Sequence, residues 1–139
     1  MVKGGDCMKI SSLSITIESN VENGIYLFEP ISATGKTRLC GLIETLKERE
    51  FNVSAYYLSD YIDGIQIERK LKGKKLFVMD RVDMYSSSDI SDIIEKYRDK
   101  CLILLDLKYN HLGDGFLADG VIEIELLSPD VIRLEDPFV

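Results

Sequence analysis

Apolar and polar residues alternate with two different periods along the chain, and the changes of period predict where strands and helices lie. Residues 10–18 alternate loosely, with Ile15 and Ile17 on one side and polar residues on the other, which predicts a half-buried strand. Turn-forming residues follow at 20–24, and residues 25–28 form a short apolar strand. We expect these two strands to pair as a hairpin.

Beyond this point, predicted helices and strands alternate. Apolar residues recur at helical spacing from Lys36, over 60–71 and after Ser88, although Gly64 weakens the second of these helices and Ser59 is its expected cap. The remaining predicted strands are apolar for most of their length, and they span 51–58, 76–79, 101–105, 121–127 and 131–134.

Strands separated by helices indicate βαβ units, and strands that are apolar throughout indicate a parallel sheet covered on both faces. The expected fold class is therefore α/β: a three-layer α/β/α sandwich. Its sheet is mainly parallel, of about five strands, with short antiparallel strands at its edges. A chain of 139 residues is expected to form one domain over residues 1–139.

The charge, the cysteine count and the lack of long apolar runs argue against several classes of function. The chain has 17 Lys and Arg against 24 Asp and Glu, a net charge of −7, which argues against nucleic-acid binding because phosphate backbones require surplus cations. Three cysteines are too few and too irregular for a disulfide framework or a zinc site, and Cys40 and Cys101 are expected to be buried thiols. Without a signal-peptide pattern or a long apolar run, the protein is expected to be cytoplasmic, with no membrane partner.

A candidate phosphate-binding segment lies between the predicted strand 25–28 and the helix that follows. Residues 30–37 match the phosphate-binding pattern G-x-x-x-x-G-K-[ST], except that Pro30 replaces the first glycine. Amide groups at a helix start converge on anions, a lysine reaches the β- and γ-phosphates, and a threonine hydroxyl binds Mg²⁺. The residues expected to contact the nucleotide are Ser32, Ala33, Thr34, Gly35, Lys36, Thr37 and Arg38.

With this segment the sequence resembles the P-loop NTPases. Residues 75–80 resemble the Walker B motif, an apolar strand that ends in Asp80. The resemblance implies that ATP and Mg²⁺ are the cofactors. It also implies that Lys36 and Asp80 are the catalytic residues, and that Thr37 and Asp80 hold the metal.

The order of elements resembles the additional-strand division of that superfamily, which includes RecA-like, AAA+ and ABC ATPases. In those families the strand after Walker B lies between the Walker B strand and the P-loop strand. Residues 118–126 also resemble the edge strand of RecA-like ATPases. Both motifs are then expected to face one crevice at the carboxyl ends of the strands.

Three positions depart from the family pattern. Pro30 fixes its φ angle and lacks an amide donor, Ala33 stands where many relatives have glycine, and Arg81 occupies the place of the usual catalytic glutamate. ATP hydrolysis is therefore expected to be weak, or to depend on a protein partner or a second copy of the chain that completes the site. The alternative is a degenerate P-loop fold that serves as a non-catalytic interaction module. A small-molecule kinase is the third hypothesis, although no Arg-rich lid is evident.

Several single residues have two interpretations. Asp106 is either a sensor-like polar residue after a strand or an ordinary turn carboxylate. Arg81 and Arg98 are candidate arginine fingers, but surface ion pairs are the more common role of such residues. His111 is expected to be a solvated loop residue, and the expected acidic edge consists of Asp83, Asp89 and Asp92.

Overall fold

The computed structural model describes residues 8–12, 14–28, 33–48, 52–79, 87–106 and 118–138. Within these ranges three strands come first, helices and strands then follow in turn, and the last three elements are strands. In chain order the elements are β1 (Met8–Ser12), β2 (Ile15–Ser19), β3 (Gly24–Phe28), α1 (Ala33–Leu46), β4 (Val53–Tyr56), α2 (Leu58–Ile62), α3 (Ile67–Leu71), β5 (Leu76–Met79), α4 (Ser87–Lys96), β6 (Leu102–Leu105), β7 (Gly120–Ser128) and β8 (Val131–Glu135).

All of these strands belong to one eight-stranded sheet in the order β1-β2-β8-β7-β3-β6-β5-β4. The block from β7 to β4 is parallel throughout, whereas β7 pairs with β8 and β1 with β2 in antiparallel fashion. β6 lies between β3 and β5, as the resemblance implied. β7 is not an edge strand, however, because β8 pairs along its other side.

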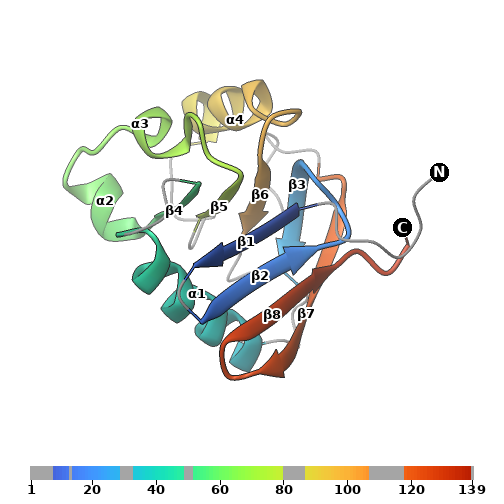
Figure 1. Ribbon diagram of the computed structural model, residues 1–139. Helices are drawn as coiled ribbons and strands as arrows, with labels where there is room; N and C mark the ends of the chain where they lie inside the picture. The colour runs from blue at the N-terminus through green and yellow to red at the C-terminus, as the bar shows by residue number, and fades with distance from the viewer. Residues whose placement is uncertain are drawn as a thin grey trace.

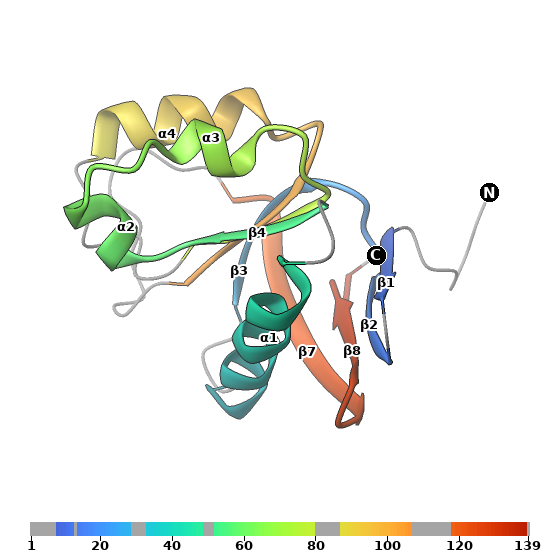
Figure 2. The same ribbon diagram turned by 60° about the vertical axis from the view of Figure 1, so that its left-hand side comes forward.

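The sheet is curled, and its two faces are covered differently (Figure 1). α1 lies on the concave side, where β1, β2 and β8 wrap toward it, and Figure 2 shows this arrangement from the side. Its packing forms one apolar cluster, which includes Ile17, Leu39, Ile43, Leu104 and Ile132. α3 and α4 cover the convex side over β4, β5 and β6 and form a second cluster, which includes Ile67, Leu71, Phe77, Ile94 and Ile103.

The expected mixed α/β class with a mainly parallel sheet is confirmed. The expected three-layer sandwich is met only in part. Helices lie on both faces over the β3-β6-β5-β4 portion, but the outer face of β1, β2, β8 and β7 carries none of the described helices, and the sheet as a whole is a half-barrel (Figures 1 and 2). The strands that close the curl come from both ends of the chain, an arrangement that short-range periodicity does not reveal.

The predicted pairing of residues 10–18 with 25–28 is wrong. The first segment is itself a hairpin, β1 and β2, and β2 pairs with β8 instead of β3. The physical reason lies in the apolar positions: Met8 and Ile10 are even-numbered, Ile15 and Ile17 are odd-numbered, and all four are buried. A single straight strand would place these pairs on opposite faces, so the chain reverses between them.

The helix predicted over 60–71 is also wrong as a continuous element, because it is divided into α2 and α3. Gly64 adopts a φ of +78°, a left-handed conformation that ends the first helix. Ser59 is not the cap. Tyr57 occupies the cap position, and its backbone N–H donates to the Asp60 carboxylate at 2.8 Å.

The remaining predicted elements agree with the structure to within a few residues. Cys101 is buried as expected, whereas Cys40 is only partly buried. None of the helices among the described residues combines the length and the apolar character needed to cross a membrane.

Candidate functional site

The candidate site lies at the carboxyl ends of the central parallel strands. β3 ends at Phe28 and the first helix begins at Ala33, while β5 ends at Met79 and Asp106 directly follows β6. The backbone N–H of Asp106 donates to the carbonyl of Met79 at 2.9 Å, which continues the β5–β6 pairing by one residue. The backbone of Asp106 is therefore held in place by its hydrogen bond to β5 in the centre of the sheet.

Lys36 and Asp106 meet at this edge. The Lys36 Nζ atom lies 2.9 Å from Asp106 Oδ1, and the two side chains are 23% and 24% exposed. The same ammonium lies 6.0 Å from the centre of the Phe28 ring. A hydrogen-bonded ion pair in this setting is stronger than a solvent-exposed one. The structure thus gives Asp106 a specific partner, which neither interpretation from the sequence had named.

Gly35 has a packing role that the sequence analysis missed. It is buried, and a Cβ atom placed there would lie 2.9 Å from Ile124 Cγ2 and 3.0 Å from Ile124 Cβ. The first turn of α1 therefore approaches β7 as closely as glycine allows. In the sequence Ile124 was one apolar position of a predicted strand and did not indicate this contact.

The other predicted nucleotide contacts are distributed around the first turns of α1. Ala33 and Thr34 belong to its first turn, and Thr37 is exposed beside Lys36. Arg38 is also exposed, and its Nε donates to the carbonyl of Pro129 in the β7–β8 turn at 2.8 Å. Arg38 is therefore held at the β7–β8 hairpin in the structure.

Several predicted residues lie outside the described part of the chain. These residues come from the predicted phosphate-binding segment, from the predicted metal ligands and from the other candidates: Pro30, Ser32, Asp80, Arg81, Asp83 and His111. Among the described residues, no group of three or more His, Cys, Asp or Glu side chains is placed to hold a metal ion. In the part of the chain that the structure describes, Lys36 and Asp106 form a charged pair at this edge.

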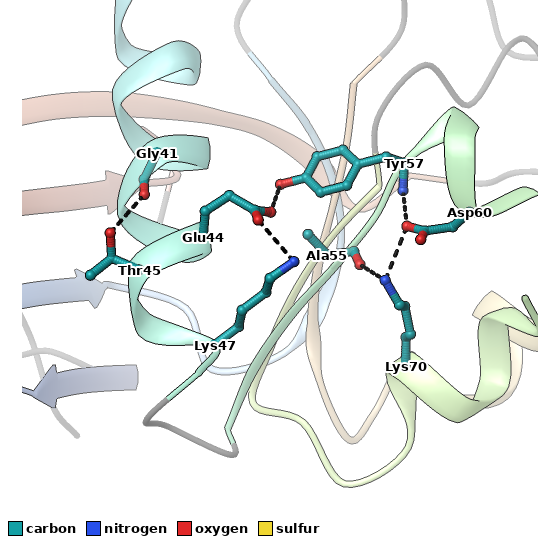
Figure 3. Close-up of polar contacts among 8 residues, drawn as sticks. All are labelled: Gly41, Glu44, Thr45, Lys47, Ala55, Tyr57, Asp60 and Lys70. Carbon is teal, nitrogen blue, oxygen red and sulfur yellow. Dashed lines mark hydrogen bonds and ion pairs between the residues drawn. The ribbon is translucent and has the colours of Figure 1, made fainter.

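A polar cluster at the end of β4 was not predicted (Figure 3). The Tyr57 hydroxyl donates to Glu44 on α1, and Lys70 on α3 forms an ion pair with Asp60 at 3.0 Å. Although burial acts to raise it, hydrogen bonds from Lys47 and Tyr57 hold the pKa of the Glu44 carboxyl below its ordinary value. Since each charge in the cluster has an opposite partner, it fastens α1, β4 and α3 together.

Arg98 forms the ion pairs that were expected as its more common role. Its guanidinium is hydrogen-bonded to both oxygens of Glu95, and Nη1 lies 2.6 Å from Asp119 Oδ2. The hydrogen bonds to Glu95 raise the pKa of Arg98, with a further contribution from Asp119. Asp119 in turn accepts the N–H of Ile25 at 2.9 Å, so the group joins α4 to β3.

Cys101 offers no nucleophile. The residue is 1% exposed, and burial raises the pKa of its thiol to about 12. At neutral pH the reactive thiolate is therefore essentially absent.

Comparisons with known proteins add no family assignment. No family model matches the chain, and neither the curated proteins nor the solved structures include a match. The functional argument therefore depends on the geometry and chemistry of the residues themselves.

The Lys36–Asp106 pair is expected to contribute about 0.5–1 kcal/mol to stability, since both side chains are mostly buried but reach solvent. The measurement is a double-mutant cycle of Lys36→Met and Asp106→Asn, followed by urea denaturation. If the loss of stability in the double variant equals the sum of the two single losses, within about 0.3 kcal/mol, the contact is contradicted.

Proposed function

We propose that the chain is an ATP-binding domain of the P-loop type, with hydrolysis that is weak or depends on a partner. The observation that carries this proposal is the position of Lys36, on the first turn of the helix that follows β3 and at the carboxyl edge of a parallel sheet. Open parallel sheets bind ligands at this edge, where helix N-termini provide amide donors for an anion.

The strand order supports the same proposal. The order β7-β3-β6-β5-β4 places the lysine-bearing helix after β3 and places β6 between β3 and β5. That order is the one implied by the resemblance to additional-strand P-loop NTPases. The helix, sheet and helix layers over this portion are the part of the fold that such a domain would share.

Magnesium would be held by oxygen ligands from two segments. Thr37 is exposed next to Lys36, and Asp80 directly follows Met79, the last residue of β5. A hydroxyl and a carboxylate suit Mg²⁺, which prefers oxygen ligands and keeps several waters. The ion would offset the charge of the phosphates.

Slow hydrolysis follows from the sequence after β5. Attack by water requires a group that orients the nucleophile, and Arg81 stands where the resemblance would supply a glutamate. A partner protein or a second copy of the chain would supply the missing group. The domain by itself is therefore expected to bind ATP with little turnover.

A non-catalytic interaction module is the second candidate, and two observations favour it. Gly35 is accounted for by its contact with Ile124, and Lys36 is already neutralised by Asp106. Both features let the motif residues serve the fold without a ligand.

Nucleotide binding is tested by the stability of the purified protein with and without ATP and Mg²⁺. At a ligand concentration of 100 times Kd, binding adds about 2.7 kcal/mol to the free energy of unfolding. Lys36→Met is expected to lose most of this increment, because it removes the cation that contacts the phosphates. Lys9→Met, at an exposed position on edge strand β1, is the matched control and should retain it.

An unchanged free energy of unfolding for the wild-type protein would reject ATP binding and leave the interaction module. An equal increment in the wild type and Lys36→Met would show that ATP binds elsewhere.

A further inference from the structure

We propose that Asp106 is a built-in competitor for the phosphate-binding lysine: it holds Lys36 in the unliganded protein and lowers the affinity of the site for nucleoside triphosphate. This inference rests on the proposed function and adds to it a device that sets the affinity. The ion pair of 2.9 Å between Lys36 Nζ and Asp106 Oδ1 is its geometric basis.

Asp106 is well placed to hold the lysine because its backbone is fixed. Its N–H continues the pairing of β6 with β5 by donating to Met79 at 2.9 Å, so the Cα atom stays at the edge of the sheet. Lys36 reaches it from the first turn of α1, a helix anchored by the contact of Gly35 with Ile124. The contact thus joins two rigid elements.

Lys36 is confined as well as paired. Its ammonium lies 6.0 Å from the Phe28 ring centre, and the side chain is only 23% exposed. Turning toward a phosphate at the start of α1 requires the ammonium to give up a charged hydrogen bond. Such a bond is more stabilising than one between neutral groups, so the exchange opposes ligand binding.

The carboxylate also repels the phosphate directly. A phosphate that binds Lys36 near its present position brings a second anion close to Asp106. Partial burial weakens the screening of this repulsion by solvent. Removing the negative charge at residue 106 therefore favours the bound state in two ways: Lys36 is released and the repulsion disappears.

The alternative is that Asp106 positions Lys36 for the phosphate. An ammonium has three donors and can bind a carboxylate and a phosphate together. In that case removal of the carboxylate weakens binding. The two roles predict opposite signs, so a single affinity measurement separates them.

The experiment is titration calorimetry of ATP with Mg²⁺ against the wild type, Asp106→Asn and Asp106→Ser. Both variants are expected to bind about fivefold more tightly, a change that corresponds to about 1 kcal/mol. Asp106→Glu keeps the charge and should stay closer to the wild type. Glu68→Gln is the control, because it removes an ion pair of similar length with Lys96, formed at 3.0 Å on the convex side of the sheet and more exposed to solvent, and it should leave the affinity unchanged.

A second readout needs no nucleotide. Release of Lys36 in Asp106→Asn should raise the rate at which a small amine-acylating reagent modifies it, as measured by peptide mass spectrometry. Two variants at residue 106 guard against the failure of one of them to fold.

The outcomes separate the two proposals. Equal or weaker binding by Asp106→Asn and Asp106→Ser, with a wild type that binds ATP, overturns the competitor role and leaves the proposed function standing. Absence of binding in the wild type and in both variants overturns both proposals.

Discussion

Replacing Gly24 with alanine is expected to lower the free energy of unfolding by about 3 kcal/mol. Gly24 opens β3 with a φ of +123°, a backbone conformation that side chains rarely adopt. An added Cβ atom would also lie 2.9 Å from both Asp119 Oδ2 and Tyr26 Cε1. The same Asp119 oxygen accepts hydrogen bonds from Ile25 and Arg98, so the substitution disturbs backbone strain, packing and an ion pair together.

Two other glycines provide controls for the backbone part of this effect. Gly64 and Gly73 have φ values of +78° and +79°, and a Cβ atom at either position meets nothing within 4 Å. Alanine there is expected to lower stability by about 1 kcal/mol, the strain of a left-handed residue alone. Urea denaturation of the three variants gives the comparison. A loss at Gly24 no larger than at Gly64 would show that the crowding at Asp119 and Tyr26 relaxes without penalty.

The sequence predicted the parallel part of the fold well because each of those strands carries its own signal. Residues 76–79 and 101–105 are continuous apolar runs, and buried central strands are apolar on both faces. The alternation with helices then determines that neighbouring strands run parallel. These are local properties, and reading them requires no knowledge of long-range contacts.

The curl of the sheet could not be predicted in the same way. It depends on the pairing of β2 with β8, which joins residues such as Ile17 and Ile132 that are far apart in the chain. Period-two patterns identify each strand but not its partner, and the two signals at 10–18 and 25–28 suggested the nearest partner by default. The half-barrel thus follows from contacts that no local pattern encodes.

The sequence predicted which residues stand at the candidate site, but not which residues they contact. Gly35, Lys36 and Thr37 were placed correctly at the start of a helix that follows an apolar strand. What the pattern omitted were the partners, Asp106 for Lys36 and Ile124 for Gly35, since both come from distant strands. A motif defines which atoms are available, and the surrounding fold determines what they contact.

Replacing Gly35 with valine is expected to cost about 3 kcal/mol of stability, because the branched side chain would overlap Ile124, and Cβ alone lies 2.9 Å from its Cγ2 atom. Gly41 on the same helix provides the control, as it is exposed and has open space around it. Gly41→Val should change stability by only a few tenths of a kcal/mol. Urea denaturation is again the measurement.

A second substitution distinguishes the two roles of this glycine. If Gly35 is required only for packing, Ile124→Ala should restore more than half of the loss in the Gly35→Val background, and a loss that persists would contradict the contact. The double variant should then be titrated with ATP and Mg²⁺. Recovered stability with recovered binding indicates that the glycine serves the helix–strand contact. Recovered stability without binding indicates that the anion itself approaches the backbone where only glycine leaves room, as a phosphate-binding turn requires.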